Sequence, residues 1–399
     1  MGSKRSRMLG AGVAMAVAGL LASACGNKVP PALSQTPPST STTSTLPLRR
    51  TTTSAATGST PADLTATTAA VTGDAWQPAA ANLAGVPSEC GNVSMLSVRP
   101  DRDMVITSVA QRGLWAETDG ASTWTALGQG AGSATITNRG IMVVYDPTNP
   151  NTFWEAGIYN GGGIYRTDDN GATFRPLGSI DHTEGVGVDL SDPTRRTLVA
   201  SIHETPAVWR SSDGGQNWTD LSATLPPGVG YAGSPLVFDT QTYVVGSHRS
   251  TGSGVLRTTD GGASWKVVHL GGVVGIPLQA SDGSIYWVLE SGGVVRSTDT
   301  GATWTQVARD GATLPGAGQI IELPDGRLAA VGNKVVIVSA DHGTSWRALG
   351  PGLPFSPTGL AYSPFRKAFY AWYFTCNTPG DNPVLADSIM TLAYEAVPS

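Results

Sequence analysis

The stretch YRTDDNGATF, residues 165–174, decides the fold because its pattern recurs along the chain. Aligned on the aspartate, good copies stand at Asp169, Asp213, Asp260, Asp299 and Asp341. A degenerate copy at Asp119 has Ala121 in place of the glycine. The six aspartates are separated by 50, 44, 47, 39 and 42 residues. A period in the forties predicts a repeat architecture.

Each position of this Asp motif has a local structural reason. Asp and Asn at turns bond the backbone amides that follow. Glycine two residues later accepts a positive φ at little steric cost. The flanking Ser or Thr can bond across a hairpin, and the aromatic residue can pack between neighbouring repeats. The sequence therefore predicts that the five Asp motifs are structural hairpin turns.

The residues around the first good copy divide into four short strands. Apolar or β-branched segments at 140–147, 152–159, 162–169 and 172–177 are separated by turns rich in Gly, Pro and Asn. Short strands at spacings near ten residues are typical of all-β folds. Four strands in a repeat of 40 to 50 residues predict one blade of a β-propeller.

The motif resembles the Asp-box, or bacterial neuraminidase repeat. Similar repeats occur in sialidases, xyloglucan-degrading glycoside hydrolases, sortilin-type receptors and a photosystem II assembly propeller. The turns in VVYDPTNPNTFWEAG (143–157) and VDLSDPTRRTLVAS (188–201) are similar to those of the last three groups. The resemblance implies a single sialidase-like propeller but leaves the activity open, because one fold hosts many functions.

A seventh blade without the motif is expected at the C-terminus. Segments 358–364, 367–376 and 388–395 predict three strands, and residues 76–83 are expected to supply the fourth. This arrangement favours seven blades over six. Cys90 and Cys376 would then lie at the ring junction, where a disulfide would lock the closure. The alternative is two free buried thiols, which are less common in exported proteins.

The N-terminus predicts export. Lys4, Arg5 and Arg7 precede a short apolar run that ends in small residues, as in a signal peptide. Residues 1–25 end in LASAC, which resembles a bacterial lipobox with Cys25 as the lipidated residue. The Thr/Ser/Pro-rich residues 26–73 predict a disordered stalk before a propeller at 74–399. We expect a lipid anchor on the extracytoplasmic face of the membrane, with plain secretion as the alternative.

Composition narrows the choice of partners. Only 14% of the residues are charged, the formal net charge is −5, and no basic stripe is present, so nucleic acid is not expected as a partner. The predicted partner, apart from the membrane, is a glycan or an extracellular protein. No cofactor is expected, and we expect a monomer.

Polar residues concentrate in loops that should share one face. In a four-stranded meander, the loop before strand one and the loop between strands two and three lie on the face opposite the Asp motifs. The residues that this argument gathers as a candidate binding site are Tyr159, His182, Glu184, His203, Glu204, Tyr231, His248 and Arg249. The spacing of these His and Glu residues matches no metal-ligand motif, so no metal is predicted.

This candidate site supports two functional hypotheses and a structural alternative. The first is ligand binding without established catalysis. The second is a sialidase-like exo-glycoside hydrolase that uses Glu184, Glu204 and His203 for acid–base chemistry. The sialidase arginine motif is matched only by Arg99-Pro100, and Tyr370 and Tyr373 are as consistent with core positions as with a nucleophile. Alternatively, the site residues are polar loop residues that stabilise contacts between blades.

Overall fold

The computed structural model describes residues 73–91, 93–308, 318–374, 376 and 380–396. The predicted signal peptide, Cys25 and all of the predicted stalk except Gly73 lie outside the described residues. No helix within the described ranges is long and apolar enough to cross a membrane.

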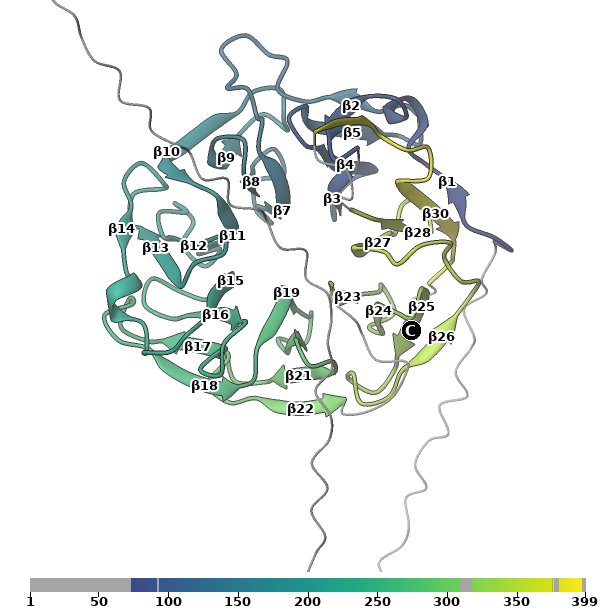
Figure 1. Ribbon diagram of the computed structural model, residues 1–399. Coiled ribbons are helices and arrows are strands. Elements are labelled where there is room, and N and C mark those ends of the chain that lie inside the picture. Colours follow the sequence, from purple (N-terminus) through teal and green to yellow (C-terminus); the bar gives the residue numbers. More distant parts are fainter. Residues whose placement is uncertain (1–72, 92, 309–317, 375, 377–379, 397–399) are drawn as a thin grey trace, which may run out of the picture. The chain divides into compact units, whose positions relative to one another are not determined.

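Seven four-stranded antiparallel sheets form the ring of a β-propeller (Figure 1). Blade 1 contains β3 (Val93–Val98), β4 (Met104–Val109), β5 (Gly113–Thr118) and β6 (Thr125–Ala126). Blade 2 contains β7 (Arg139–Tyr145), β8 (Phe153–Ile158), β9 (Gly163–Thr167) and β10 (Arg175–Asp181). Blade 3 contains β11 (Thr183–Val188), β12 (Leu198–Ile202), β13 (Ala207–Ser211) and β14 (Thr219–Asp220). Blade 4 contains β15 (Tyr231–Val237), β16 (Tyr243–His248), β17 (Gly254–Thr258) and β18 (Lys266–Leu270).

The remaining blades repeat this order up to the ring junction. Blade 5 contains β19 (Val273–Gln279), β20 (Ile285–Leu289), β21 (Val294–Ser297) and β22 (Thr305–Ala308). Blade 6 contains β23 (Ile321–Glu322), β24 (Leu328–Gly332), β25 (Val335–Ser339) and β26 (Arg347–Leu349). The described residues also include two short 3₁₀ helices, η1 (Ala81–Leu83) and η2 (Ser222–Thr224).

Blade 7 is built from both ends of the folded chain. Its strands are β27 (Gly359–Ser363), β28 (Ala368–Trp372), β30 (Ile389–Ala393) and the N-terminal β1 (Gln77–Pro78). Gln77 of β1 pairs with Thr391 of β30. The predicted seventh blade and its N-terminal fourth strand are therefore confirmed.

Apolar side chains fill the spaces between neighbouring blades. The described residues form seven buried hydrophobic clusters, one at each blade–blade junction. At the junction of blades 3 and 4, Trp265 is 8% exposed and packs with Val199 and Val208 of blade 3. The aromatic residue of this Asp motif thus lies between blades, as its position predicts.

The Asp motifs form the turns between the third and fourth strands. In the copy at Asp169, one carboxylate oxygen accepts hydrogen bonds from the Thr167 hydroxyl and the Thr173 amide, both at 2.8 Å. The Gly171 amide donates to the Thr167 hydroxyl at 2.8 Å. In the copy at Asp260, the Ser264 hydroxyl and amide donate to the carboxylate and lower the pKa of Asp260 to about 2. The carboxylate oxygens of these turns thus accept hydrogen bonds from residues within the same turn.

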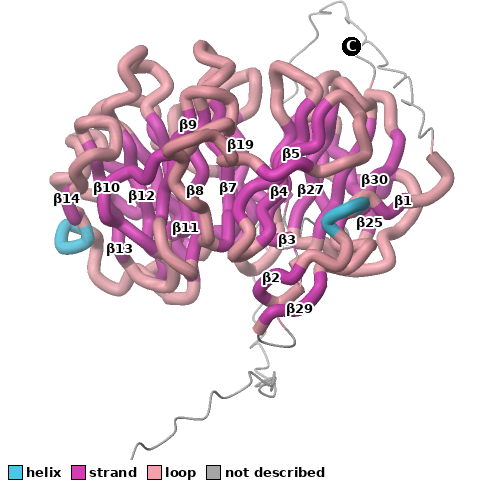
Figure 2. Tube along the Cα trace, turned by 90° about the horizontal axis from the view of Figure 1, so that it is seen from above, coloured by secondary structure: helices cyan, strands magenta, loops and turns pink. Residues whose placement is uncertain are grey.

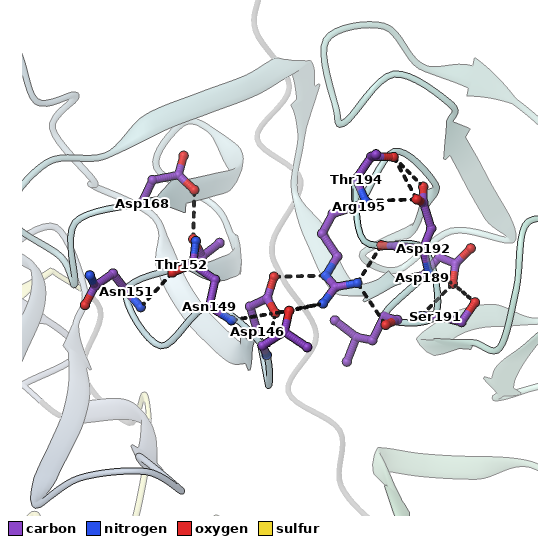
Figure 3. Close-up of polar contacts among 12 residues, drawn as sticks. Asp146, Asn149, Asn151, Thr152, Asp168, Asp189, Ser191, Asp192, Thr194 and Arg195 are labelled. Carbon is purple, nitrogen blue, oxygen red and sulfur yellow. Dashed lines mark hydrogen bonds and ion pairs between the residues drawn. The ribbon is translucent and has the colours of Figure 1, made fainter.

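The turns that begin with Asp146 and Asp189 join blades 2 and 3 (Figure 3). Asp146 accepts from the Thr148 amide at 2.9 Å, and Asp189 accepts from the Ser191 amide at 3.0 Å. Arg195 reaches from the turn of blade 3 to the carboxylate of Asp146 in blade 2. These turns lie at the same end of the blades as the Asp motifs, since they connect the first strand to the second.

A two-stranded ribbon stands outside the seven blades. It pairs β2 (Pro87–Glu89) with β29 (Asp381–Pro383), and Figure 2 shows it projecting beyond the ends of the blade strands. Cys90, directly after β2, forms a disulfide with Cys376, at a Cα–Cα distance of 4.8 Å. The expectation that Cys376 ends a strand of blade 7 is wrong, because β28 ends at Trp372 and Cys376 lies in the loop leading to the ribbon.

Candidate functional site

The eight residues of the predicted site come from blades 2, 3 and 4, all at the end of the blades opposite the Asp motifs. Tyr159 follows β8, His203 and Glu204 follow β12, and Arg249 follows β16. His182 precedes β11, Tyr231 begins β15 and His248 ends β16. Glu184 was expected in a loop before the first strand but lies inside β11. Glu184 therefore belongs to the innermost strand of blade 3.

A hydrogen-bonded chain of three side chains is the centre of the site. The Tyr159 hydroxyl lies 2.9 Å from His203 Nε2, and His203 Nδ1 contacts the carboxylate of Glu184. A carboxylate at Nδ1 favours the tautomer with its proton on Nδ1. In that tautomer Nε2 accepts the hydrogen bond that Tyr159 donates. Three residues from two blades thus share one defined proton arrangement.

The aromatic rings and Glu204 complete this half of the site. The Tyr159 ring meets the rings of His203 and His182 edge-on, at centroid distances of 5.1 and 5.6 Å. Glu204 lies 3.8 Å from His203 Nε2 with its side chain 55% exposed. Burial, followed by the negative charge of Glu204, raises the pKa of Tyr159 above its ordinary value. The phenol therefore keeps its proton near neutral pH and acts as a hydrogen-bond donor.

The other half of the site is a small pocket in blades 2 to 5. Glu184 and His248 line a cavity of about 150 Å³ together with Ser234 and apolar residues that include Ile141 and Val274. Burial lowers the pKa of His248, so its imidazole is neutral near pH 7. Its Nδ1 atom is buried and has no hydrogen-bond partner among the described residues. Glu184 is shared by the pocket and by the chain through His203.

Tyr231 contacts His248 of the pocket, and Arg249 in turn contacts Tyr231. The Tyr231 ring meets the His248 ring edge-on at 5.9 Å. The Arg249 guanidinium lies 5.6 Å from the centre of the Tyr231 ring, within cation–π range. Contacts therefore link each of the eight predicted residues to another member of the set. The structure brings them together on one face.

Sequence reasoning missed a group of residues beside Tyr159. The guanidinium of Arg139 lies 4.8 Å from the centre of the Tyr159 ring and 4.5 Å from that of Phe374. Glu89 of the ribbon forms an ion pair with Arg139 at 3.0 Å and accepts a hydrogen bond from Asn160 at 2.8 Å. The predicted disulfide could have pointed to these residues, because Glu89 lies next to Cys90 and Phe374 lies two residues before Cys376 in the sequence.

The two glutamates do not have the arrangement that a glycosidase acid–base pair needs. Such pairs flank a scissile bond across an open gap of roughly 5 to 10 Å. Here Glu184 contacts one nitrogen of the His203 ring and Glu204 lies near the other. The imidazole therefore occupies the space between the two carboxylates.

The residues compared with sialidases also have structural contacts. Arg99 is 1% exposed and lies at the Asp-motif end of the blades. Its guanidinium donates to Asp101 and Asn170 and to the Pro150 carbonyl, and so joins blade 1 to blade 2. Tyr370 is buried, with its hydroxyl 3.1 Å from Arg366. Neither residue faces the candidate site.

The His and Glu side chains of the site could in principle also be metal ligands. Among the described residues, no group of three or more His, Cys, Asp or Glu side chains is placed to hold a metal ion. The imidazoles and carboxylates of the site instead contact one another and the neighbouring aromatic rings.

Comparisons with known proteins show the fold. No protein-family model matches the chain, and no curated protein matches it. Among solved structures, it is similar to a GH74 xyloglucanase from Xanthomonas campestris, with 19% identity, a TM-score of 0.53, and 78% of this chain and 56% of that chain covered. An extracellular domain assigned to a hybrid two-component system of B. thetaiotaomicron is 10% identical, with a TM-score of 0.54 and 77% and 38% of the two chains covered.

A third similar structure is of comparable length. YCF48 from Cyanidioschyzon merolae is 13% identical, with a TM-score of 0.50 and 80% and 98% of the two chains covered. The chain thus spans about half of the xyloglucanase and less than half of the B. thetaiotaomicron domain. Identities this low show a shared propeller fold and transfer no activity.

Proposed function

We propose that this protein binds a glycan at the face formed by blades 2 to 4. The observation that carries the proposal is the Tyr159–His203–Glu184 chain beside the pocket that Glu184 shares with His248. Sugar hydroxyls both donate and accept hydrogen bonds, and sugar rings also present apolar C–H faces. A carboxylate, two imidazoles and a phenol beside apolar walls match both requirements.

The size of the pocket favours a glycan over a protein ligand. A cavity of about 150 Å³ holds a group the size of one six-membered ring. Ligand sites typically combine apolar walls with a few placed polar groups, as this pocket does. Binding without hydrolysis is favoured because His203 fills the space between Glu184 and Glu204.

A glycan array with a hydrolysis readout tests the proposal. Purified protein should retain a defined set of glycans, xyloglucan oligosaccharides and sialylated glycans being among the probes, and leave their masses unchanged. Retention of no glycan would overturn the proposal. Cleavage of a retained glycan would replace it with the glycoside hydrolase hypothesis.

We also propose that the propeller belongs to the Asp-box type and is displayed at the cell surface as a lipoprotein. The five Asp motifs and the LASAC sequence that ends at Cys25 support this. A lipid on Cys25 and a stalk of residues 26–73 would leave the glycan-binding face free to meet extracellular ligands.

A further inference from the structure

The ribbon that the disulfide closes lies directly beside the candidate site. β2 and β29 pair antiparallel through Pro87–Pro383, Ser88–Asn382 and Glu89–Asp381. Cys90 follows β2, and Cys376 precedes β29. The disulfide thus links the two strands at the end of the ribbon where Glu89 pairs with Asp381.

Glu89 connects the ribbon to blade 2. It is next to Cys90 in sequence, and its carboxylate accepts a hydrogen bond from Asn160 Nδ2 at 2.8 Å. The same carboxylate oxygen pairs with Arg139 Nη2 at 3.0 Å. Asn160 is the neighbour of Tyr159 in the loop after β8, so Glu89 holds that loop from outside its own blade.

Phe374 connects the second side of the disulfide to the same place. It stands two residues before Cys376, and its ring lies 4.5 Å from the Arg139 guanidinium carbon. That carbon also lies 4.8 Å from the centre of the Tyr159 ring. The Arg139 side chain is only 13% exposed, so Glu89, Phe374 and Tyr159 hold it in one orientation.

The contacts continue without a gap from the disulfide into the site. Arg139 and Asn160 position Tyr159, and the Tyr159 hydroxyl bonds His203 Nε2 at 2.9 Å. We infer that the ribbon closed by Cys90–Cys376 is a wall of the binding site, and that Glu89 and Phe374 are positioning residues for Tyr159. This inference rests on the proposed function, but its structural part is testable without any ligand.

The test measures the His203 imidazole by ¹⁵N NMR in the full-length protein. Oxidised wild type should show the single tautomer with the proton on Nδ1. A Cys90→Ser/Cys376→Ser double variant and Phe374→Leu should show a mixture of tautomers, whereas Phe374→Tyr should restore the single one. Asp381→Asn is the matched control, because it removes the exposed ribbon pair with Arg112 at 3.2 Å and leaves Glu89 and Phe374 in place.

A dithiol reductant provides the same test without mutation. It supplies two electrons and two protons, so that the S–S bond breaks, Cys90 and Cys376 become thiols, and the reductant becomes a disulfide. Reduction should give the same mixture of tautomers, with circular dichroism showing that the propeller stays folded. An unchanged His203 spectrum in folded reduced protein and in Phe374→Leu would overturn the inference.

Ligand measurements separate this inference from the proposed function. For a glycan retained on the array, the double variant and Phe374→Leu should raise the dissociation constant at least tenfold, and Phe374→Tyr should restore it. If the tautomer changes as expected but the array retains no glycan, the ribbon still positions Tyr159, while the glycan proposal and the role of the ribbon as a wall of its site both fail. If binding is weakened equally by Asp381→Asn, the specific roles of Glu89 and Phe374 are refuted.

Discussion

The guanidinium of Arg195 forms two hydrogen bonds with the carboxylate of Asp146, from Nε at 2.9 Å and from Nη2 at 2.8 Å. The side chains are only 4% and 6% exposed, and they belong to different blades. These bonds hold the pKa of Asp146 well below its ordinary value of 3.8. The pair is thus a buried, bidentate link across one blade junction.

Removing Arg195 should strongly destabilise the propeller. Arg195→Ala leaves the buried Asp146 carboxylate without its counter-ion, a loss of roughly 3–5 kcal/mol in the free energy of unfolding. Because the pKa of Asp146 is depressed, the stabilisation is complete above pH 3.8 and is lost as the pH falls further. Denaturant unfolding at pH 7 and pH 3 checks both points. The neighbouring exposed Arg196→Ala should change stability by less than about 0.5 kcal/mol, and a similar loss there would contradict the assignment.

Burial of Glu155 should make the stability of the protein depend on pH in the opposite sense. Glu155 is 0% exposed, and burial raises its pKa to about 8 from the ordinary 4.5. Asn138 donates to Oε2 at 3.2 Å, while Glu155 Oε1 and Asn138 Oδ1 have no hydrogen-bond partner in the part of the chain that the structure describes. We expect the carboxyl to be protonated and its hydroxyl to donate to Asn138 Oδ1, which satisfies both atoms.

The folded state then holds a proton that the unfolded state releases. Stability should fall as the pH rises from about 4.5 to 8, by about 1.4 kcal/mol per pH unit for this one proton. Glu155→Gln keeps the shape and removes the titration, so its unfolding free energy should lose this slope. Denaturant unfolding of both proteins at several pH values measures it. Equal slopes would mean that Glu155 is ionised in the folded protein.

The Asp motifs should matter for stability and not for ligand binding. Trp265→Ala removes a side chain that is 8% exposed at a blade junction, a loss of about 3–5 kcal/mol. Asp260→Ala frees the Ser264 and Thr258 groups that bond its carboxylate and should lower the melting temperature by less. Glycan retention per folded molecule should be unchanged in both variants. A folded Asp260→Ala protein that no longer retains the glycan would contradict this, because it would place the ligand at the Asp-motif end of the blades.

The site residues should show the reverse behaviour. Tyr159→Phe, His203→Ala and Glu184→Gln each remove one member of a hydrogen-bonded chain. A lost partner costs about 1–3 kcal/mol, or roughly a tenfold to hundredfold rise in the dissociation constant. The melting temperature should change little, because the His203 and Glu184 side chains are partly exposed. Calorimetry measures the dissociation constant, and thermal unfolding measures the melting temperature. If stability falls and binding falls only in proportion to it, these residues are loop residues that only stabilise the blades.

The proposed lipid anchor on Cys25 makes a prediction about the location of the protein. Cys25→Ser should move the protein from the membrane fraction to the medium and abolish incorporation of a labelled fatty acid. The basic start, the short apolar run and LASAC motivate this expectation. Wild-type protein that is soluble and carries no label would refute it.

Much of the fold was predictable because its determinants are local. Each Asp motif encodes its own turn, as the bonds within residues 167–173 show. The face shared by Tyr159, His203 and His248 followed from strand order alone, because antiparallel strands alternate their ends. The position of Glu184 inside β11 was missed, because the boundary of a strand is only weakly encoded.

The contribution of the ribbon was not predictable in the same way. Glu89, Arg139 and Phe374 are far apart in sequence, and no short-range pattern relates them. They meet only because the ring closes and the disulfide brings two loops together. Contacts of this kind depend on the finished three-dimensional arrangement and leave no periodic signal.

The pairing of β1 with β30 sets an order of events during synthesis. Gln77 of β1 is made long before its partner Thr391 of β30. Pairing of residues so distant in sequence is slow, because the closure entropy of the whole intervening chain must be overcome. A chain that stops short of Ile389 would leave β1 without its partner and blade 7 incomplete. Unpaired strand edges are templates for association with other chains, so a chain that lacks β30 should associate with other chains more readily than one in which β1 and β30 complete blade 7.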